Sequence, residues 1–152
     1  MLLIPHSLLG EWGGANLDTP MVGDDYERAC AVSSYLGRIP VGRGFALVLG
    51  DAPDSTTVLQ SVLGFVLLRW GCADSEADML ASARANLGKA KVLEELEHRI
   101  EESEHLLIDS AWSGSDFQDS LELRIPPGAY KISTRRHREP TVEFLAHVFQ
   151  KC

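Results

Sequence analysis

The stretch GFVLLRWGCADSEADMLASARANL, residues 64–87, contains the patterns of two secondary structures in succession. Residues 64–73 are almost entirely apolar, with one charged side chain at Arg69, and this composition predicts a central β-strand. The period changes at Asp74, which is a suitable helix N-cap, and apolar residues then recur near helical spacing until Gly88. A strand followed by a helix is therefore predicted, and the fold must combine both kinds of element.

Four further segments have the composition of strands, namely residues 1–4 (MLLI), 45–50 (FALVLG), 105–112 (HLLIDSAW) and 141–149 (TVEFLAHVF). In residues 120–125 (SLELRI), apolar and charged side chains alternate, which predicts a half-buried strand. The Pro-Pro-Gly sequence that follows is typical of a type II turn, so residues 129–134 (AYKIST) are expected to return antiparallel to this strand. Residues 50–57 (GDAPDSTT) are a second turn-forming cluster.

Residues 89–103 (KAKVLEELEHRIEES) place apolar side chains at helical spacing, with most Glu residues on the outer face, and predict a second helix. The predicted fold class is α+β: a mostly antiparallel β-sheet of six to eight strands with one or two helices inserted in the middle of the chain. A chain of 152 residues is long enough to bury roughly two thirds of its unfolded surface. Since no internal repeat is present, a single domain over residues 1–152 is expected.

The charge distribution limits the kinds of partner. The net charge of -8 would repel a polyanion, so a nucleic-acid partner is not expected and a basic partner is favoured. Residues 94–104 contain six Glu and one Arg, whereas residues 131–138 contain four Lys and Arg residues and no acid. This asymmetry predicts a dipolar molecule.

The three cysteines, Cys30, Cys72 and Cys152, are odd in number and include no CxxC pair. Cys30 and Cys72 lie in apolar stretches and are expected to be small core residues, so a reducing cytoplasm is the predicted compartment. The apolar N-terminus lacks a basic region and is interrupted by Pro5, which argues against a signal peptide and against a membrane span.

No metal-binding or catalytic signature is visible in the sequence. The five histidines form none of the HxxxH, HxH or HExxH pairs that place two ligands on one face, so neither a metal nor a cofactor is expected. Ser110 and Ser113 lie near Asp109, but the segment is not GxSxG, and a turn is the simpler interpretation. Two alternatives remain open: a small hydrolase that uses Asp109 and Ser110 with a distant His, and a β-rich domain that binds an unknown ligand.

The stretch DDYERACAV, residues 24–32, has two interpretations. It opens with five polar or charged residues, Asp24, Asp25, Tyr26, Glu27 and Arg28. Such a run is typical of a solvated loop or of a capped helix start. A Tyr beside carboxylates and an Arg is also typical of protein interfaces. The local sequence does not distinguish between these interpretations.

Six segments, taken in chain order, carry a resemblance to a known family. They are LLIPHSLLGEWGGA (2–15), DDYERACAV (24–32), YLGRIPVGRGFALVLGDAPDSTT (35–57), FVLLRWGCADSEADML (65–80), LLIDSAWSG (106–114) and LELRIPPGAYKIS (121–133). Together they resemble the immunity protein 21 family of bacterial polymorphic toxin systems, from about residue 2 to residue 135. The motifs DYERAC, VLGD and RW-x-x-ADSE carry most of the resemblance, and none of them is a catalytic motif.

The resemblance implies a cytoplasmic protein that binds a toxin domain and blocks it without catalysing a reaction. The implied partner is a cognate toxin protein, and an acidic inhibitor suits a basic toxin, for which a nuclease is one candidate. Neither nucleic acid nor a membrane is an expected partner. Under this interpretation the candidate partner-binding residues are Asp24, Asp25, Tyr26, Glu27, Glu94, Glu95 and Glu97.

A purely structural role is the alternative for the residues around Tyr26. In that case Tyr26 packs inward and Arg28 pairs with a neighbouring acid. Trp12 and Trp70 have the same two interpretations, and the otherwise apolar strand around Trp70 favours burial of that side chain.

Overall fold

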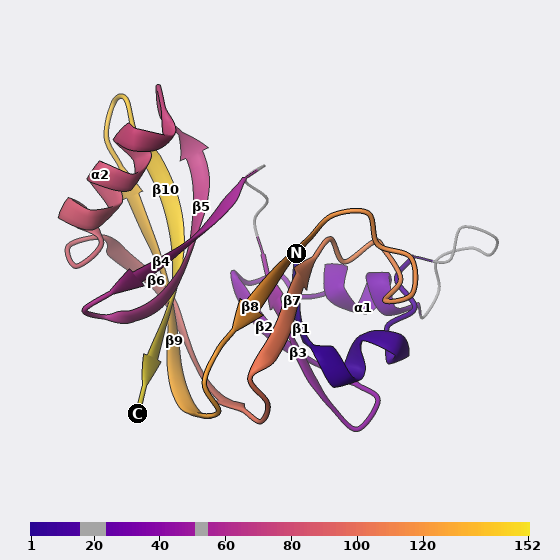
Figure 1. Cartoon of the computed structure of the whole chain (residues 1–152). Helices are drawn as coiled ribbons and strands as arrows, with labels where there is room; N and C mark the ends of the chain where they lie inside the picture. Colours follow the sequence, from indigo (N-terminus) through magenta and orange to yellow (C-terminus); the bar gives the residue numbers. More distant parts are fainter. Residues whose placement is uncertain (16–23, 51–54) are drawn as a thin grey trace. The chain divides into compact units, whose positions relative to one another are not determined.

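A computed structural model describes residues 1–15, 24–50 and 55–152, and these residues form two compact units (Figure 1). Unit 1 comprises Met1–Asp51 and Ile100–Pro127, and unit 2 comprises Ala52–Arg99 and Gly128–Cys152. Each unit is built on a five-stranded sheet. The expectation that residues 1–152 behave as a single domain stays a prediction. Residues 51–54 of the predicted turn cluster lie outside the described residues.

The sheet of unit 1 has the strand order β2-β3-β1-β7-β8. Its strands are β1 (Leu2–Pro5), β2 (Leu36–Val41), β3 (Gly44–Leu49), β7 (Glu104–Ile108) and β8 (Ser120–Arg124). All four neighbouring pairs are antiparallel, and β1 lies in the centre between β3 and β7. The strands predicted in residues 1–4, 45–50 and 120–125 are therefore confirmed, and the one predicted in residues 105–112 is confirmed only as far as Ile108, after which the chain turns.

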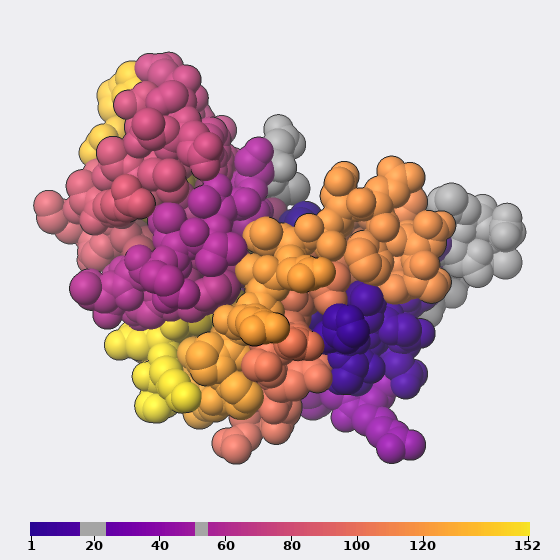
Figure 2. Space-filling view, in the orientation of Figure 1, coloured from indigo at the N-terminus to yellow at the C-terminus, as the bar shows by residue number. Residues whose placement is uncertain are grey.

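Two short helices cover one face of this sheet, the 3-10 helix η1 (His6–Glu11) and the α-helix α1 (Asp25–Cys30). None of the residues of η1 is buried, and its outer side, drawn in indigo, lies on the surface of the unit (Figure 2). Trp12 follows η1 and is 2% exposed in the core, where its indole Nε1 donates to the Ser110 carbonyl at 3.3 Å. Gly14, at a φ of 65°, has no room for a side chain, because a Cβ would lie 2.5 Å from the carbonyl carbon of Trp112.

The sheet of unit 2 has the strand order β4-β5-β10-β9-β6. Its strands are β4 (Thr56–Ser61), β5 (Gly64–Cys72), β6 (Lys91–Ile100), β9 (Gly128–Arg138) and β10 (Glu143–Lys151). The helix α2 (Glu76–Asn86) packs on one face of this sheet through Met79 and Ala83, both fully buried. The strand predicted in residues 141–149 corresponds to β10 and is confirmed.

The sequence patterns predict the fold class correctly but not the number of strands. The fold is α+β and mostly antiparallel, but the described residues form ten strands in two sheets instead of six to eight strands, with three short helices. β5 lies inside its sheet with Arg69 fully buried, as predicted for residues 64–73. The N-cap of α2 is Ser75 rather than Asp74, because the Ser75 hydroxyl accepts from the Asp78 amide at 3.2 Å.

The helix predicted in residues 89–103 is wrong, because this segment forms the strand β6. Its second half also has a period of two: Leu96, His98 and Ile100 are at least partly buried, whereas the residues between them are exposed. Both periods are present in the sequence, and the strand is stabilised by pairing with β9, a partner distant in the chain. Long-range pairing therefore overrides the helical spacing.

The hairpin predicted between residues 120–125 and 129–134 is also wrong. β8 pairs with β7, whereas β9 pairs with β10 in the other sheet. The Pro-Pro-Gly segment thus connects two units, and Gly128 has a φ of 152°, which any other residue adopts with difficulty. Alternating side chains show that a strand is half-buried, but they do not identify its partner.

All three cysteines are free and exposed. The expectation that Cys30 and Cys72 are core residues is wrong. On the short helix α1 the preceding residue, Ala29, points into the core, which turns Cys30 outward. Cys72 lies at the end of β5, beyond the buried part of that strand.

Candidate partner-binding surfaces

Asp24 and Asp25 stabilise the start of α1. Asp24 is the N-cap, and its Oδ1 accepts from the Glu27 amide at 2.7 Å. Asp25 Oδ2 accepts from the Gly13 amide at 2.8 Å, and its other oxygen forms an ion pair with Arg28. The capped helix start is thus the correct interpretation of this stretch, and Arg28 pairs with a neighbouring acid as the structural alternative predicted.

The side chains of Tyr26 and Glu27 both reach the surface of unit 1. Tyr26 is partly exposed, and a hydrogen bond with the Cys30 thiol raises the pKa of its phenol, with smaller contributions from burial and nearby charges. Glu27 is exposed on the first turn. Of the four candidates in this stretch, Glu27 is exposed, whereas Asp24, Asp25 and Tyr26 are each partly exposed.

Glu94, Glu95 and Glu97 lie on β6, an edge strand of the sheet in unit 2. Glu95 Oε2 lies 2.8 Å from the ammonium nitrogen of Lys131 on the neighbouring β9. Glu95 and Glu97 are exposed, and Glu94 is partly exposed. This cluster belongs to unit 2 and the α1 cluster to unit 1, so neither unit brings the two sets of candidates together.

The acidic strand β6 and the basic strand β9 are neighbours in one sheet. Besides the Lys131–Glu95 pair, the guanidinium of Arg138 donates twice to the Glu143 carboxylate, at 2.8 and 3.0 Å. Part of the basic stretch therefore faces acids within its own sheet, and the dipolar molecule stays a prediction.

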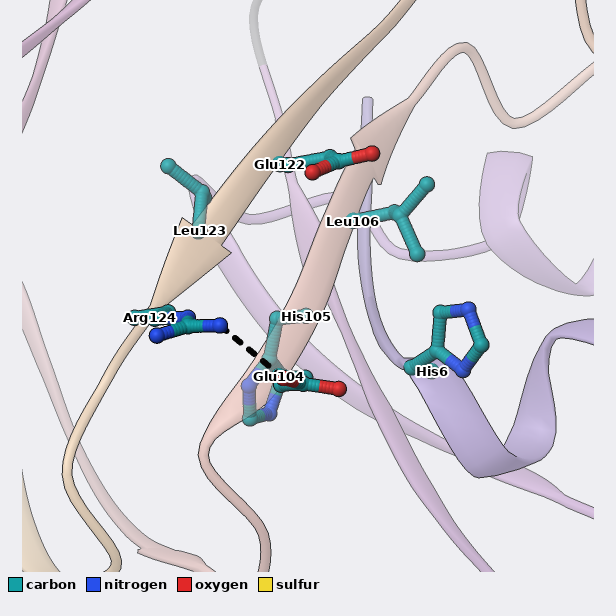
Figure 3. A pocket seen from close by; sticks show the side chains of 7 residues that line it. All are labelled: His6, Glu104, His105, Leu106, Glu122, Leu123 and Arg124. Atoms are coloured by element: carbon teal, nitrogen blue, oxygen red, sulfur yellow. Dashed lines mark hydrogen bonds and ion pairs between the residues drawn. The ribbon is translucent and has the colours of Figure 1, made fainter.

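A shallow recess of about 350 Å³ lies on unit 1 at the ends of β7 and β8 (Figure 3). The register pairs Glu104 with Arg124 and Leu106 with Glu122, and alternate residues of a strand share a face. Arg124 Nη2 lies 3.4 Å from Glu104 Oε1, and Leu106, 6% exposed, supplies an apolar floor. His6 from η1 also lines the recess.

One side of the recess carries a carboxylate. Glu104 is engaged by Arg124, whereas the carboxylate of Glu122 points across Leu106 in the close view (Figure 3). His105 alternates to the opposite face, and burial lowers the pKa of its imidazole, so it is neutral at pH 7. The recess could therefore receive a cationic or hydrogen-bond-donating side chain above an apolar floor.

Sequence reasoning missed this recess. The alternation of Glu122 and Arg124 in SLELRI indicates an exposed face, which the structure confirms. Their juxtaposition with Glu104 depends on the pairing of β8 with β7, which the expected hairpin with residues 129–134 did not indicate. The short spacing between the two strands was the available signal.

The two tryptophans with open interpretations behave differently from expectation. Trp12 is the buried one, at 2% exposure. Trp70 is only partly buried, and its Nε1 donates to Thr57 Oγ1 at 3.3 Å. The burial favoured for Trp70 is thus reached only in part: its side chain packs against the core of unit 2 from near the end of β5.

The residues considered for hydrolysis have local structural partners. Asp109 Oδ1 accepts from the Ala111 amide at 2.9 Å, which closes a turn, and Ser110 is buried with its carbonyl bonded to Trp12. Within the described ranges, no three His, Cys, Asp or Glu side chains are grouped to hold a metal ion. The absence of a metal and of a cofactor stays a prediction.

The fold and these surfaces define a small α+β protein whose exposed polar groups suit contact with another protein. The chain matches the immunity protein 21 family over residues 1–142 of 152, and it belongs to that family. Comparison with curated proteins and with solved structures gives no match. In the part of the chain that the structure describes, no helix has the length and apolar character needed to cross a membrane.

Proposed function

We propose that this chain is the antidote to a cognate polymorphic toxin, which it binds and neutralises in the cytoplasm of the cell that makes both. The observation that carries this proposal is the match to the immunity protein 21 family over nearly the whole chain. Neutralisation by binding alone is part of this proposal, and membership of an immunity-protein family supports it. A small hydrolase and a ligand-binding domain are the alternatives that it replaces.

The charge of the chain supports a basic toxin domain as the partner. The net charge of -8 attracts a cationic surface and accelerates its association. A nuclease fits this description, because its substrate-binding surface is basic. Neither nucleic acid nor a membrane is proposed as a partner.

The partner-binding residues that we propose are the exposed members of the acidic clusters. Glu27 and Tyr26 on α1 and Glu95 and Glu97 on β6 are the best placed, whereas Asp24 and Asp25 act by holding α1 in position. Glu94 belongs to the same set as a partly exposed neighbour. The recess beside Glu122 is an additional position for a Lys or Arg side chain of the toxin.

Co-expression tests this function directly. A toxin domain, sought among the genes next to this one, is induced in a sensitive host with and without the full chain, and growth is followed. We expect growth to be restored by the chain, and a purified complex to form with a toxin variant inactivated in its active site. Unrelieved toxicity, together with no complex at micromolar concentrations, would reject the proposal.

A further inference from the structure

The outer strands of the two sheets differ in how their edges are protected. Native proteins protect an edge strand with charged side chains, proline or a bulge, because its unpaired N–H and C=O groups can accept another strand. In unit 1, β2 contains Arg38 and Pro40, and β8 contains Glu122 and Arg124. In unit 2, β6 has the sequence KVLEELEHRI, with acids and bases along its length. The remaining edge, β4, has the sequence TTVLQS and contains neither a charge nor a proline.

The backbone of β4 is regular, and among the described residues no strand pairs with its outer side. Its register against β5 runs from Thr56 opposite Arg69 to Ser61 opposite Gly64 without a bulge. The Trp70 amide donates to the Ser55 carbonyl at 3.0 Å, so Ser55 faces β5. Alternate residues of an antiparallel strand face the same side, which directs the backbone groups of Thr56, Val58 and Gln60 outward.

The side chains of β4 also suit strand addition. All six residues of the strand retain partial or full exposure, and two Thr and one Val give it high β-propensity. Val62, in the turn that leads to β5, is fully exposed. Atoms of this hairpin, drawn in magenta, lie on the face of the protein seen in Figure 2.

We propose that β4 is the docking edge for an extended segment of the cognate toxin, which adds to the sheet of unit 2 as a further strand. This inference rests on the proposed antidote function. Thr56, Val58 and Gln60 offer three N–H and three C=O groups, so an extended segment of about five residues pairs with all of them. The neutral edge suits a segment of uncharged, β-branched or hydroxyl-bearing residues, while the acids elsewhere attract the basic body of the toxin.

A second copy of this chain is the competing occupant, because two β4 edges could pair with each other. Each copy carries a net charge of -8, so two copies repel one another, whereas a basic toxin is attracted. Charge therefore favours the toxin as the occupant.

Residue-resolved hydrogen exchange tests the proposal and contains its own control. In the free protein, the outward amides of Thr56, Val58 and Gln60 should exchange rapidly, and the inward amides of Thr57 and Leu59 should be protected. Binding of the inactivated toxin domain should slow exchange at the three outward positions by at least about tenfold. A complex that leaves these amides unprotected would overturn the docking edge while leaving the antidote function intact.

Substitution of Val58 supplies the second test. Val58→Pro removes an outward N–H without touching the ladder between β4 and β5, since proline is tolerated at such edge positions. We expect the Kd for the inactivated toxin domain to rise about tenfold or more, with an unchanged far-UV spectrum. Val58→Thr is the matched control, because it keeps the shape and the amide, and its Kd should stay within about twofold of the wild type.

Three results would contradict the docking edge. The first is equal Kd values for Val58→Pro and Val58→Thr in folded proteins. The second is protection of the outward amides in a toxin-free dimer, which would assign β4 to a second copy. The third is full suppression of toxicity by Val58→Pro at expression levels where Val58→Thr is just sufficient. A failure of the wild-type chain to bind the toxin at all would instead reject the proposed function.

Discussion

The two units attach a helix to a sheet by different means. In unit 1, α1 has one buried residue, Ala29, and is held mainly by polar contacts. Asp25 binds the Gly13 amide, the Tyr26 amide donates to the Gly14 carbonyl at 3.2 Å, and Arg28 donates to the Pro40 carbonyl at 2.9 Å. These bonds compensate for the small apolar surface that six helical residues can bury.

In unit 2, α2 is held mainly by apolar packing. Met79 and Ala83 are fully buried, and Leu87 is 4% exposed at the end of the helix. Among the acids of β6, Glu95 lies 2.8 Å from Lys131 on the neighbouring strand. The comparison shows that Asp24 and Asp25 hold α1 in place, whereas Glu95 and Glu97 are exposed on a sheet whose helix is held by apolar packing.

The largest expected change in the free energy of unfolding comes from removing apolar packing between α2 and its sheet. Met79→Ala should lower the free energy of unfolding by about 2–5 kcal/mol, because the side chain is fully buried and a cavity remains. The exposed Arg84→Ala on the same helix should change it by less than about 0.5 kcal/mol. Urea denaturation followed by circular dichroism measures both, and equal losses would show that packing does not hold α2.

Acid should destabilise unit 2 through a buried histidine. Burial, together with the charge of Arg69, lowers the pKa of His147 to about 3, whereas the unfolded value is about 6.5. The unfolded chain then binds more protons below pH 6.5, so stability is fully present above that value and is lost as the pH falls towards 3.

The expected loss from His147 alone is about 2 kcal/mol between pH 7 and pH 5. His147→Gln should flatten the dependence of the free energy of unfolding on pH over this range, whereas the exposed His6→Gln should leave it unchanged. Denaturation curves collected at several pH values provide the comparison. A slope that is the same in wild type and His147→Gln would contradict the assignment.

The polar attachment of α1 should be sensitive to a single carboxylate. Asp25→Ala removes the acceptor of the Gly13 amide and the partner of Arg28, so the free energy of unfolding should fall by about 1–2 kcal/mol. Glu97→Ala, an exposed acid on β6, should change it by less than about 0.5 kcal/mol. If thermal or urea unfolding shows the same change for both, the two clusters do not differ in the way described above.

The last prediction concerns the rate at which the chain associates with the toxin. Replacing Glu94, Glu95 and Glu97 by Lys should slow association with the inactivated toxin domain by about tenfold at low ionic strength, and most of the loss should vanish at high salt. For α1, the substitution to test is Glu27→Lys alone, because changing Asp24 or Asp25 also removes hydrogen bonds that hold the helix. Stopped-flow measurements give the association rates. Unchanged association rates for both variants would show that these acids are solvated surface residues that do not contribute to binding.

The candidate residues could be selected from the sequence, but their roles could not be separated. The run Asp24, Asp25, Tyr26, Glu27 is visible as a polar cluster, and its resemblance to a family indicates the kind of partner. That Asp25 binds the Gly13 amide depends on a loop twelve residues away, which no local pattern encodes. The recess between Glu104 and Glu122 was missed for the same reason, since it forms only where β7 and β8 pair.

The sequence by itself determined the α+β class, the family and most of the apolar strands, because apolar runs and alternation are local properties, but it did not identify residues 36–41, 56–61 and 91–100 as strands. The tertiary structure alone decided that these segments are extended, that β8 and β9 lie in different sheets, and that β4 is an edge strand with neither a charge nor a proline within it. A strand completes its hydrogen bonds only with a partner elsewhere in the chain, so its neighbours, its register and its open edges are set by long-range pairing.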